Sequence, residues 1–152
     1  MQISTHNAAS TRRTSGPAYR AVSIKGRVLI AEDEPLIALD LACEFEKAGA
    51  EVIVVHTLQN AIAIARIDAL SAAVVDLRLK NDLSSPLCAL LQLRDIPFVV
   101  YTGYSDIDCR YSRLIISKPA PVHLIIERLA VMTLNRPDRS NGNVLASHAL
   151  HR

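Results

Sequence analysis

Short apolar runs recur along the chain between residues 27 and 117, separated by polar or helical stretches. Nearly every position within a run is apolar, rather than every second one, which is typical of strands buried on both faces of a parallel sheet. The expected strands are Val28–Ala31, Val52–Val55, Ala72–Val75, Pro97–Tyr101 and Leu114–Ser117. The pattern therefore predicts a parallel β-sheet covered by helices.

Apolar residues at helical spacing separate these strands. Ile37, Leu41, Phe45 and Ala48 mark one helical face after the first strand, and Gly49 is a natural stop. The other expected helices are 58–65, 86–93 and 122–134. The stretch 103–113 is polar and short, so only a poor or single-turn helix is expected there. Five βα units with right-handed crossovers predict an α/β fold.

The two ends of the chain lack this periodicity. Residues 1–26 are rich in Ser, Thr, Ala and Arg, and we expect a disordered leader there. Residues 135–152 are expected to form a flexible tail, which leaves 27–134 as one folded domain. The leader has no apolar segment of the kind found in secretory signals, while an organelle transit peptide is a less favoured alternative.

Charge and composition narrow the function classes. Residues 1–30 contain five basic residues and no acid, and residues 135–152 carry a net +2. Subtracting both from the chain total of +2 leaves −5 on the body, which argues against a nucleic-acid-binding fold. No apolar stretch approaches a membrane span. The three cysteines are far apart and lack metal-ligand spacing, so reduced thiols in a cytoplasmic protein are expected.

Acidic residues follow two of the buried strands. Glu32, Asp33 and Glu34 come after the first strand, and Asp76 comes after the third. Each pair of like charges at about 4 Å costs roughly 4 kcal/mol at an effective dielectric near 20. A hard divalent cation or a raised pKa offsets such a cost. Because ligand sites of parallel sheets lie at the carboxyl ends of the strands, the chemistry is expected here.

Two further strand ends carry polar residues, and together the motifs resemble a known family. Thr102 lies in Tyr-Thr-Gly, and Lys118 lies in Ser-Lys-Pro. With the acidic cluster and Asp76, these motifs resemble the receiver domain of response regulators in two-component signalling, of the single-domain type. The resemblance covers about 27–134. It implies a doubly wound, flavodoxin-like sheet of order 2-1-3-4-5, with a shortened fourth helix.

The same resemblance assigns roles to individual residues. It implies that Asp76 receives a phosphoryl group, with Thr102 and Lys118 contacting that group. It also implies a Mg²⁺ ion held by Glu32, Asp33, Asp76 and the backbone carbonyl of Arg78. Many members have Asp where this chain has Glu32, a difference of one methylene. The family's cis peptide bond is expected between Lys118 and Pro119.

A function and two rivals follow from this resemblance. The implied donor is a histidine kinase or a phosphotransfer protein, and the signal passes to a downstream protein or the domain acts as a phosphate sink. Only 18 residues follow Leu134, too few for a DNA-binding domain. The first rival is a receiver-fold adaptor or dimerisation module that is not phosphorylated, and a homodimer is left open. The second is an enzyme of similar fold, which the residues disfavour because aspartate phosphatases need a second Asp at position 78.

Some polar residues near these motifs have simpler interpretations. Glu34 is expected to be a solvated acid at a helix start. His56 follows the second strand and is interpreted as a partly exposed loop histidine rather than a catalytic one. His123 is expected on the surface. The scattered positions of the five histidines argue against a zinc site.

Overall fold

A five-stranded parallel sheet forms the centre of the molecule. The computed structural model describes residues 22–104 and 109–136. The strands are β1 (Arg27–Ala31), β2 (Glu51–Val55), β3 (Leu70–Val75), β6 (Phe98–Thr102) and β7 (Ile115–Ser117). They pair in the order β2-β1-β3-β6-β7, and every pairing is parallel. This confirms the predicted order, because β6 and β7 are the fourth and fifth strands of this sheet.

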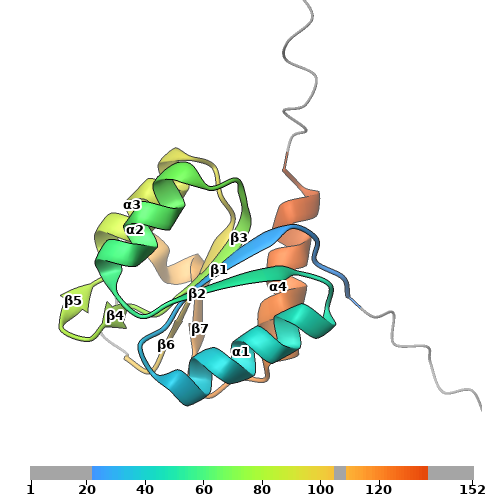
Figure 1. The fold of residues 1–152 in the computed structure, drawn as a ribbon, viewed down its shortest axis with the longest axis horizontal. Coiled ribbons are helices and arrows are strands. Elements are labelled where there is room, and N and C mark those ends of the chain that lie inside the picture. The colour runs from blue at the N-terminus through green and yellow to red at the C-terminus, as the bar shows by residue number, and fades with distance from the viewer. Residues whose placement is uncertain (1–21, 105–108, 137–152) are drawn as a thin grey trace, which may run out of the picture.

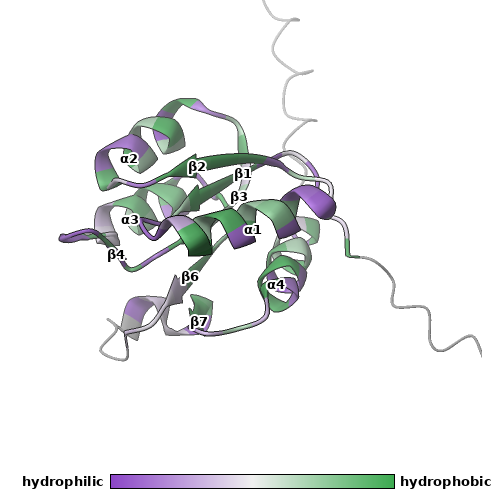
Figure 2. Ribbon diagram, turned by 60° about the horizontal axis from the view of Figure 1, so that its bottom comes forward, coloured by the Kyte–Doolittle hydropathy of each residue, from purple (hydrophilic) through white to green (hydrophobic). Residues whose placement is uncertain are grey.

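Helices cover both faces of the sheet (Figure 1). Their bounds are α1 (Pro35–Lys47), α2 (Leu58–Ile67), α3 (Ser85–Leu93) and α4 (Val122–Leu134). One core lies beneath α1 and α4 and contains Phe45 and Leu129, while the opposite core lies beneath α2 and α3 and contains Leu87. In Figure 2 the strands are largely hydrophobic, while the helices carry polar residues along one side, as expected for a sheet buried on both faces.

The helix starts and stops follow local sequence signals. Pro35 occupies the first turn of α1, where a missing N–H costs little. Gly49 follows α1 with a φ of +98°, a conformation that side chains disfavour. At α2 the side chain of Thr57 accepts a hydrogen bond of 3.3 Å from the Asn60 N–H, which satisfies one free donor of the first turn.

Short elements follow β3 and β6, and only the first of them was not expected. The polar loop predicted after Asp76 contains a small antiparallel hairpin, β4 (Arg78–Leu79) and β5 (Asp82–Leu83). Between β6 and β7, a 3-10 helix, η1 (Cys109–Leu114), stands where a short or single-turn helix was expected, and residues 105–108 lie outside the described part.

The described body also begins before Arg27. Ile24 is buried, and its N–H donates to the carbonyl of Ala48 at 3.1 Å. The remainder of the expected leader, and the tail beyond residue 136, lie outside the described residues. The Lys118–Pro119 peptide bond is cis, as expected. Among the residues described, no helix combines the length and apolar character needed to cross a bilayer.

Candidate functional site

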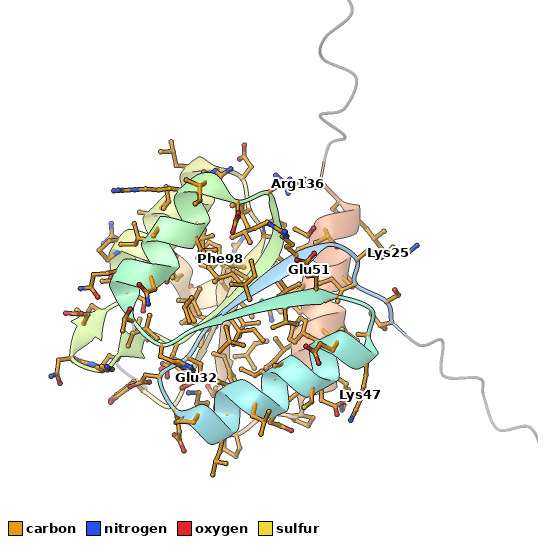
Figure 3. All side chains as sticks on the ribbon, viewed as in Figure 1. Lys25, Glu32, Lys47, Glu51, Phe98 and Arg136 are labelled. Atoms are coloured by element: carbon orange, nitrogen blue, oxygen red, sulfur yellow. The ribbon has the colours of Figure 1, made fainter. Side chains whose placement is uncertain are left out.

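The sheet brings four polar strand ends to one edge. Glu32 follows β1, Asp76 follows β3, Thr102 ends β6, and Lys118 follows β7. Because these strands are parallel neighbours, their carboxyl ends lie on the same side of the molecule. Figure 3 shows Glu32 near the start of α1, at the opposite end of the sheet from Glu51 and Arg136. The predicted convergence of the strand ends is therefore present.

Lys118 links the two buried carboxylates. Its Nζ lies 2.7 Å from Oε2 of Glu32 and 2.8 Å from Oδ2 of Asp76. Its side chain is 16% exposed, and those of Glu32 and Asp76 are 2% and 9% exposed. A charged pair this well shielded from water interacts much more strongly than a surface pair. One ammonium group therefore holds together carboxylates that would otherwise repel each other.

Three carboxylates could hold a metal ion at this edge. Oxygen atoms of Glu32, Asp33 and Asp76 all lie within 4.8 Å of one another. Backbone donors fix two of these groups: the Glu34 N–H lies 3.1 Å from Oε1 of Glu32, and the Lys80 N–H lies 2.9 Å from Oδ2 of Asp33. Carboxylate oxygens are the ligands that hard divalent cations prefer. The donor set therefore fits Mg²⁺.

Asp76 is anchored by the hairpin that follows it. The Arg78 N–H lies 3.3 Å from Oδ1 of Asp76, and the buried Ser84 hydroxyl donates to the Asp76 carbonyl at 2.6 Å. A hollow of about 620 Å³ opens above the carboxylate. At its rim the Arg78 guanidinium lies 5.4 Å from the centroid of the Tyr104 ring, a cation–π contact. The role predicted for the Arg78 carbonyl oxygen stays a prediction.

Thr102 lies at the same edge but does not line this hollow, whereas its neighbour Gly103 does. The residue is fully buried, its carbonyl accepts from the Lys118 N–H at 2.8 Å, and its Oγ1 accepts from the Tyr104 N–H at 3.2 Å. Its hydroxyl hydrogen is not used by the Tyr104 contact. The predicted contact between Thr102 and a phosphoryl group stays a prediction.

Burial and ion pairing shift the pKa values of two residues of the site. Burial raises the pKa of Glu32, and the negative charge of Asp76 adds to this, outweighing the hydrogen bonds from Lys118 and Glu34. Burial by itself would lower the pKa of Lys118, but its bonds to Asp76 and Glu32 raise it overall. The lysine is therefore firmly charged, whereas burial disfavours the negative charge of Glu32.

His56 belongs to the site in a way that the sequence interpretation missed. The ring is exposed, as expected of a loop histidine, but its Nδ1 lies 2.7 Å from the carbonyl oxygen of Glu32. Its position directly after β2, at the same sheet edge as the acids, was the available signal. Glu34 and His123 are exposed, as predicted.

Comparisons with known proteins agree with this geometry. No protein-family model matches the sequence, and no curated protein matches it. Among solved structures, SdrG from Sphingomonas melonis Fr1 is 33% identical with a TM-score of 0.63, covering 74% of this chain and 97% of SdrG. The non-phosphorylated HemR receiver domain from Leptospira biflexa is 25% identical with a TM-score of 0.65, covering 74% of this chain and 98% of that domain.

A third similar structure holds a modified aspartate and an ion. This response regulator protein from Burkholderia pseudomallei, solved with a phosphorylated aspartic acid, a calcium ion and citrate, is 29% identical with a TM-score of 0.59. The match covers 70% of this chain and 66% of that protein. Each of these three similarities covers 70% or more of this chain.

Proposed function

Because this chain belongs to the response-regulator receiver family of two-component signalling, we propose that it accepts a phosphoryl group on Asp76. The contact between Asp76 and Lys118, beside two further carboxylates, is the observation that carries the proposal. The proposed donor is a phosphohistidine on a histidine kinase or phosphotransfer protein. A carboxylate oxygen of Asp76 forms the new bond to phosphorus, the P–N bond of the donor breaks, and the donor imidazole keeps that electron pair.

The surrounding residues supply charge and position, which is most of what phosphoryl transfer requires. Lys118 pairs with the carboxylate beforehand and with phosphoryl oxygens afterwards. Thr102 donates its hydroxyl to another of these oxygens. Glu32, Asp33, Asp76 and the Arg78 carbonyl would hold Mg²⁺, which when bound offsets the negative charge of the carboxylates and of the phosphoryl group. The calcium ion in the similar response regulator supports a divalent-cation site here.

The proposed output is a signal rather than a catalysed reaction. Phosphorylation would shift the population of conformations towards one that a downstream protein binds, or the domain would drain phosphoryl groups from the kinase. The receiver domain is proposed to span 27–134, with the buried Ile24 just before it packed against the same core, and to be flanked by a leader and a tail. Protein partners, and not nucleic acid, suit the acidic body.

Mass spectrometry after incubation with Mg²⁺ and a small phosphodonor such as acetyl phosphate tests this function. We expect a mass gain of one phosphoryl group that requires Mg²⁺ and disappears in the Asp76→Asn variant. Asp40→Asn removes an exposed acid of α1 and serves as the matched control. A gain that survives Asp76→Asn, or no gain at all, contradicts the proposal.

An adaptor that is never phosphorylated is the second candidate. The Arg78–Tyr104 contact favours it, because both residues line the hollow that a donor must enter, and their contact narrows the freedom of these side chains to move aside. An unmodified protein that still captures its partner equally well with and without the phosphodonor would support the adaptor over the receiver.

A further inference from the structure

Glu32 and Asp33 pose a geometric problem that the strand alone cannot solve. Successive side chains of an extended strand point to opposite faces, so two adjacent carboxylates do not normally share one site. Here oxygen atoms of both residues lie within 4.8 Å of each other and of Asp76. The backbone must therefore turn out of the strand immediately after Ala31, where β1 ends. Something must hold the peptide unit between the two acids in that orientation.

The end of β2 supplies that restraint. The Glu32 N–H donates to the carbonyl of Val55 at 3.1 Å, directly after the last paired residues, Ala31 and Val55. The Glu32 carbonyl in turn lies 2.7 Å from Nδ1 of His56. A carbonyl oxygen can only accept, so Nδ1 must carry the hydrogen. Both backbone polar groups of Glu32 are thus held by two consecutive residues of the neighbouring strand end.

Other contacts restrain the side chains of the acids but not this peptide. The Glu34 N–H and the Lys80 N–H reach the carboxylates of Glu32 and Asp33. The exposure of the His56 ring means that its hydrogen bond is not needed to satisfy a buried imidazole. Its position therefore calls for an explanation other than core packing.

We propose that His56 is a positioning residue for the candidate metal site. Its Nδ1–H fixes the peptide between Glu32 and Asp33, so that both carboxylates face Asp76 and can bind one cation. This inference rests on the proposed function, because the cation is the Mg²⁺ of the receiver. Groups that orient metal ligands typically change metal affinity by about 10-fold to 100-fold when they are removed.

Calorimetric titration of the full chain with Mg²⁺ at constant pH tests the proposal. We expect His56→Ala to weaken Mg²⁺ binding by roughly tenfold. His56→Asn should stay within about twofold of the native protein, because its amide nitrogen can donate from nearly the place of Nδ1. His123→Ala removes an exposed histidine of α4 and should leave the affinity unchanged.

A spectroscopic measurement on the native protein needs no variant and so does not depend on the folding of His56→Ala. Nitrogen NMR of the His56 ring in metal-free protein should show the proton on Nδ1, as donation to the Glu32 carbonyl requires. A proton on Nε2 with Nδ1 bare overturns the proposal. So does a His56→Ala variant that binds Mg²⁺ as tightly as the native protein, or a native protein that binds no Mg²⁺.

The outcomes also separate this inference from the proposed function. Native protein that binds Mg²⁺ and loses affinity on His56→Ala, yet never gains a phosphoryl group, contradicts the phosphoacceptor role alone. Native protein that is phosphorylated with Mg²⁺ while His56→Ala keeps full affinity contradicts the positioning role alone.

Discussion

Lys118 is the residue on which the charge balance of the site depends. It is the cation that contacts both buried carboxylates, at 2.7 and 2.8 Å. Its raised pKa means that this stabilisation is fully present below the ordinary lysine value of 10.5 and is lost only as the pH rises through the higher folded-state value. At neutral pH the whole contribution of the ion pairs is therefore available to be measured.

Lys118→Met should expose that contribution. Methionine keeps much of the apolar stem but removes the charge, so Glu32 and Asp76 are left facing each other without a counter-ion. We expect a loss of about 3 kcal/mol in the free energy of unfolding in metal-free buffer, measured by urea denaturation at neutral pH. Lys80→Met removes an exposed lysine at the same rim and should cost no more than about 0.5 kcal/mol. Equal stabilities of the two variants would refute this view of Lys118.

Glu32 makes the opposite contribution at neutral pH. Burial raises its pKa above the ordinary 4.5, so the folded state holds the proton more tightly than the unfolded chain does. Stability therefore falls as the pH rises from about 4.5 through the folded-state pKa, and the cost persists above it. A substitution that removes the negative charge of Glu32 but keeps the shape of its side chain should therefore restore the lost stability.

Glu32→Gln is thus expected to be more stable than the native protein in metal-free buffer at neutral pH. The gain should shrink towards zero as the pH falls below about 4.5, because the native carboxyl is then protonated in both states. Urea denaturation across this pH range measures it, with Glu34→Gln as the matched loss of one exposed acid. A gain that does not depend on pH would point to a cause other than ionisation.

The elements divide into those that local sequence predicts and those that tertiary contacts create. β1 and β3 were predictable because buried parallel strands are continuous apolar runs, and α1 because Ile37, Leu41 and Phe45 share one face. The hairpin β4–β5 was not predictable: each of its strands is two residues long and has one charged residue and one leucine, too little for a strand pattern. It is held instead by distant partners, since the Lys80 N–H reaches Asp33.

The same division applies to the site. Asp76 and Lys118 stood out because charged residues directly follow buried strands, and β-strand pairing then brings them together. His56 also directly follows a strand, but its residue type did not reveal its role, because its contribution is a bond from its side chain to a backbone atom of a neighbouring strand end. Periodicity and residue type say nothing about which backbone carbonyl a loop side chain will meet.

Ser84, which lies between β5 and α3, tests how far this segment supports Asp76. Ser84 is fully buried. Its hydroxyl donates to the Asp76 carbonyl, and its N–H donates to the Leu77 carbonyl. Ser84→Ala removes the first bond and leaves a buried acceptor, so we expect a loss of about 1–3 kcal/mol in the free energy of unfolding, measured with urea. Ser112→Ala, at an exposed position of η1, should change it by less than about 0.5 kcal/mol. A Ser84→Ala variant as stable as the native protein would mean that the support of Asp76 does not depend on this hydrogen bond.

At the scale of the whole molecule, the candidate metal site exists only when the sheet is formed. Its carboxylates follow β1 and β3, which are separated by α1, β2 and α2 in the chain and become neighbours through strand pairing. A ligand that binds the folded state alone stabilises it by an amount that grows with the logarithm of its concentration. The unfolding free energy therefore reports the assembled site as a whole.

Once the Mg²⁺ concentration exceeds the dissociation constant of the site, each further tenfold increase in that concentration should add about 1.4 kcal/mol to the free energy of unfolding. Urea denaturation at a series of Mg²⁺ concentrations and constant ionic strength measures that slope. Asp33→Asn removes one of the three carboxylates and should shift the onset to much higher Mg²⁺, whereas the exposed Asp40→Asn should follow the native curve. Stability that does not respond to Mg²⁺, or responds equally in Asp33→Asn, would show that the converging carboxylates are balanced by Lys118 alone and hold no ion.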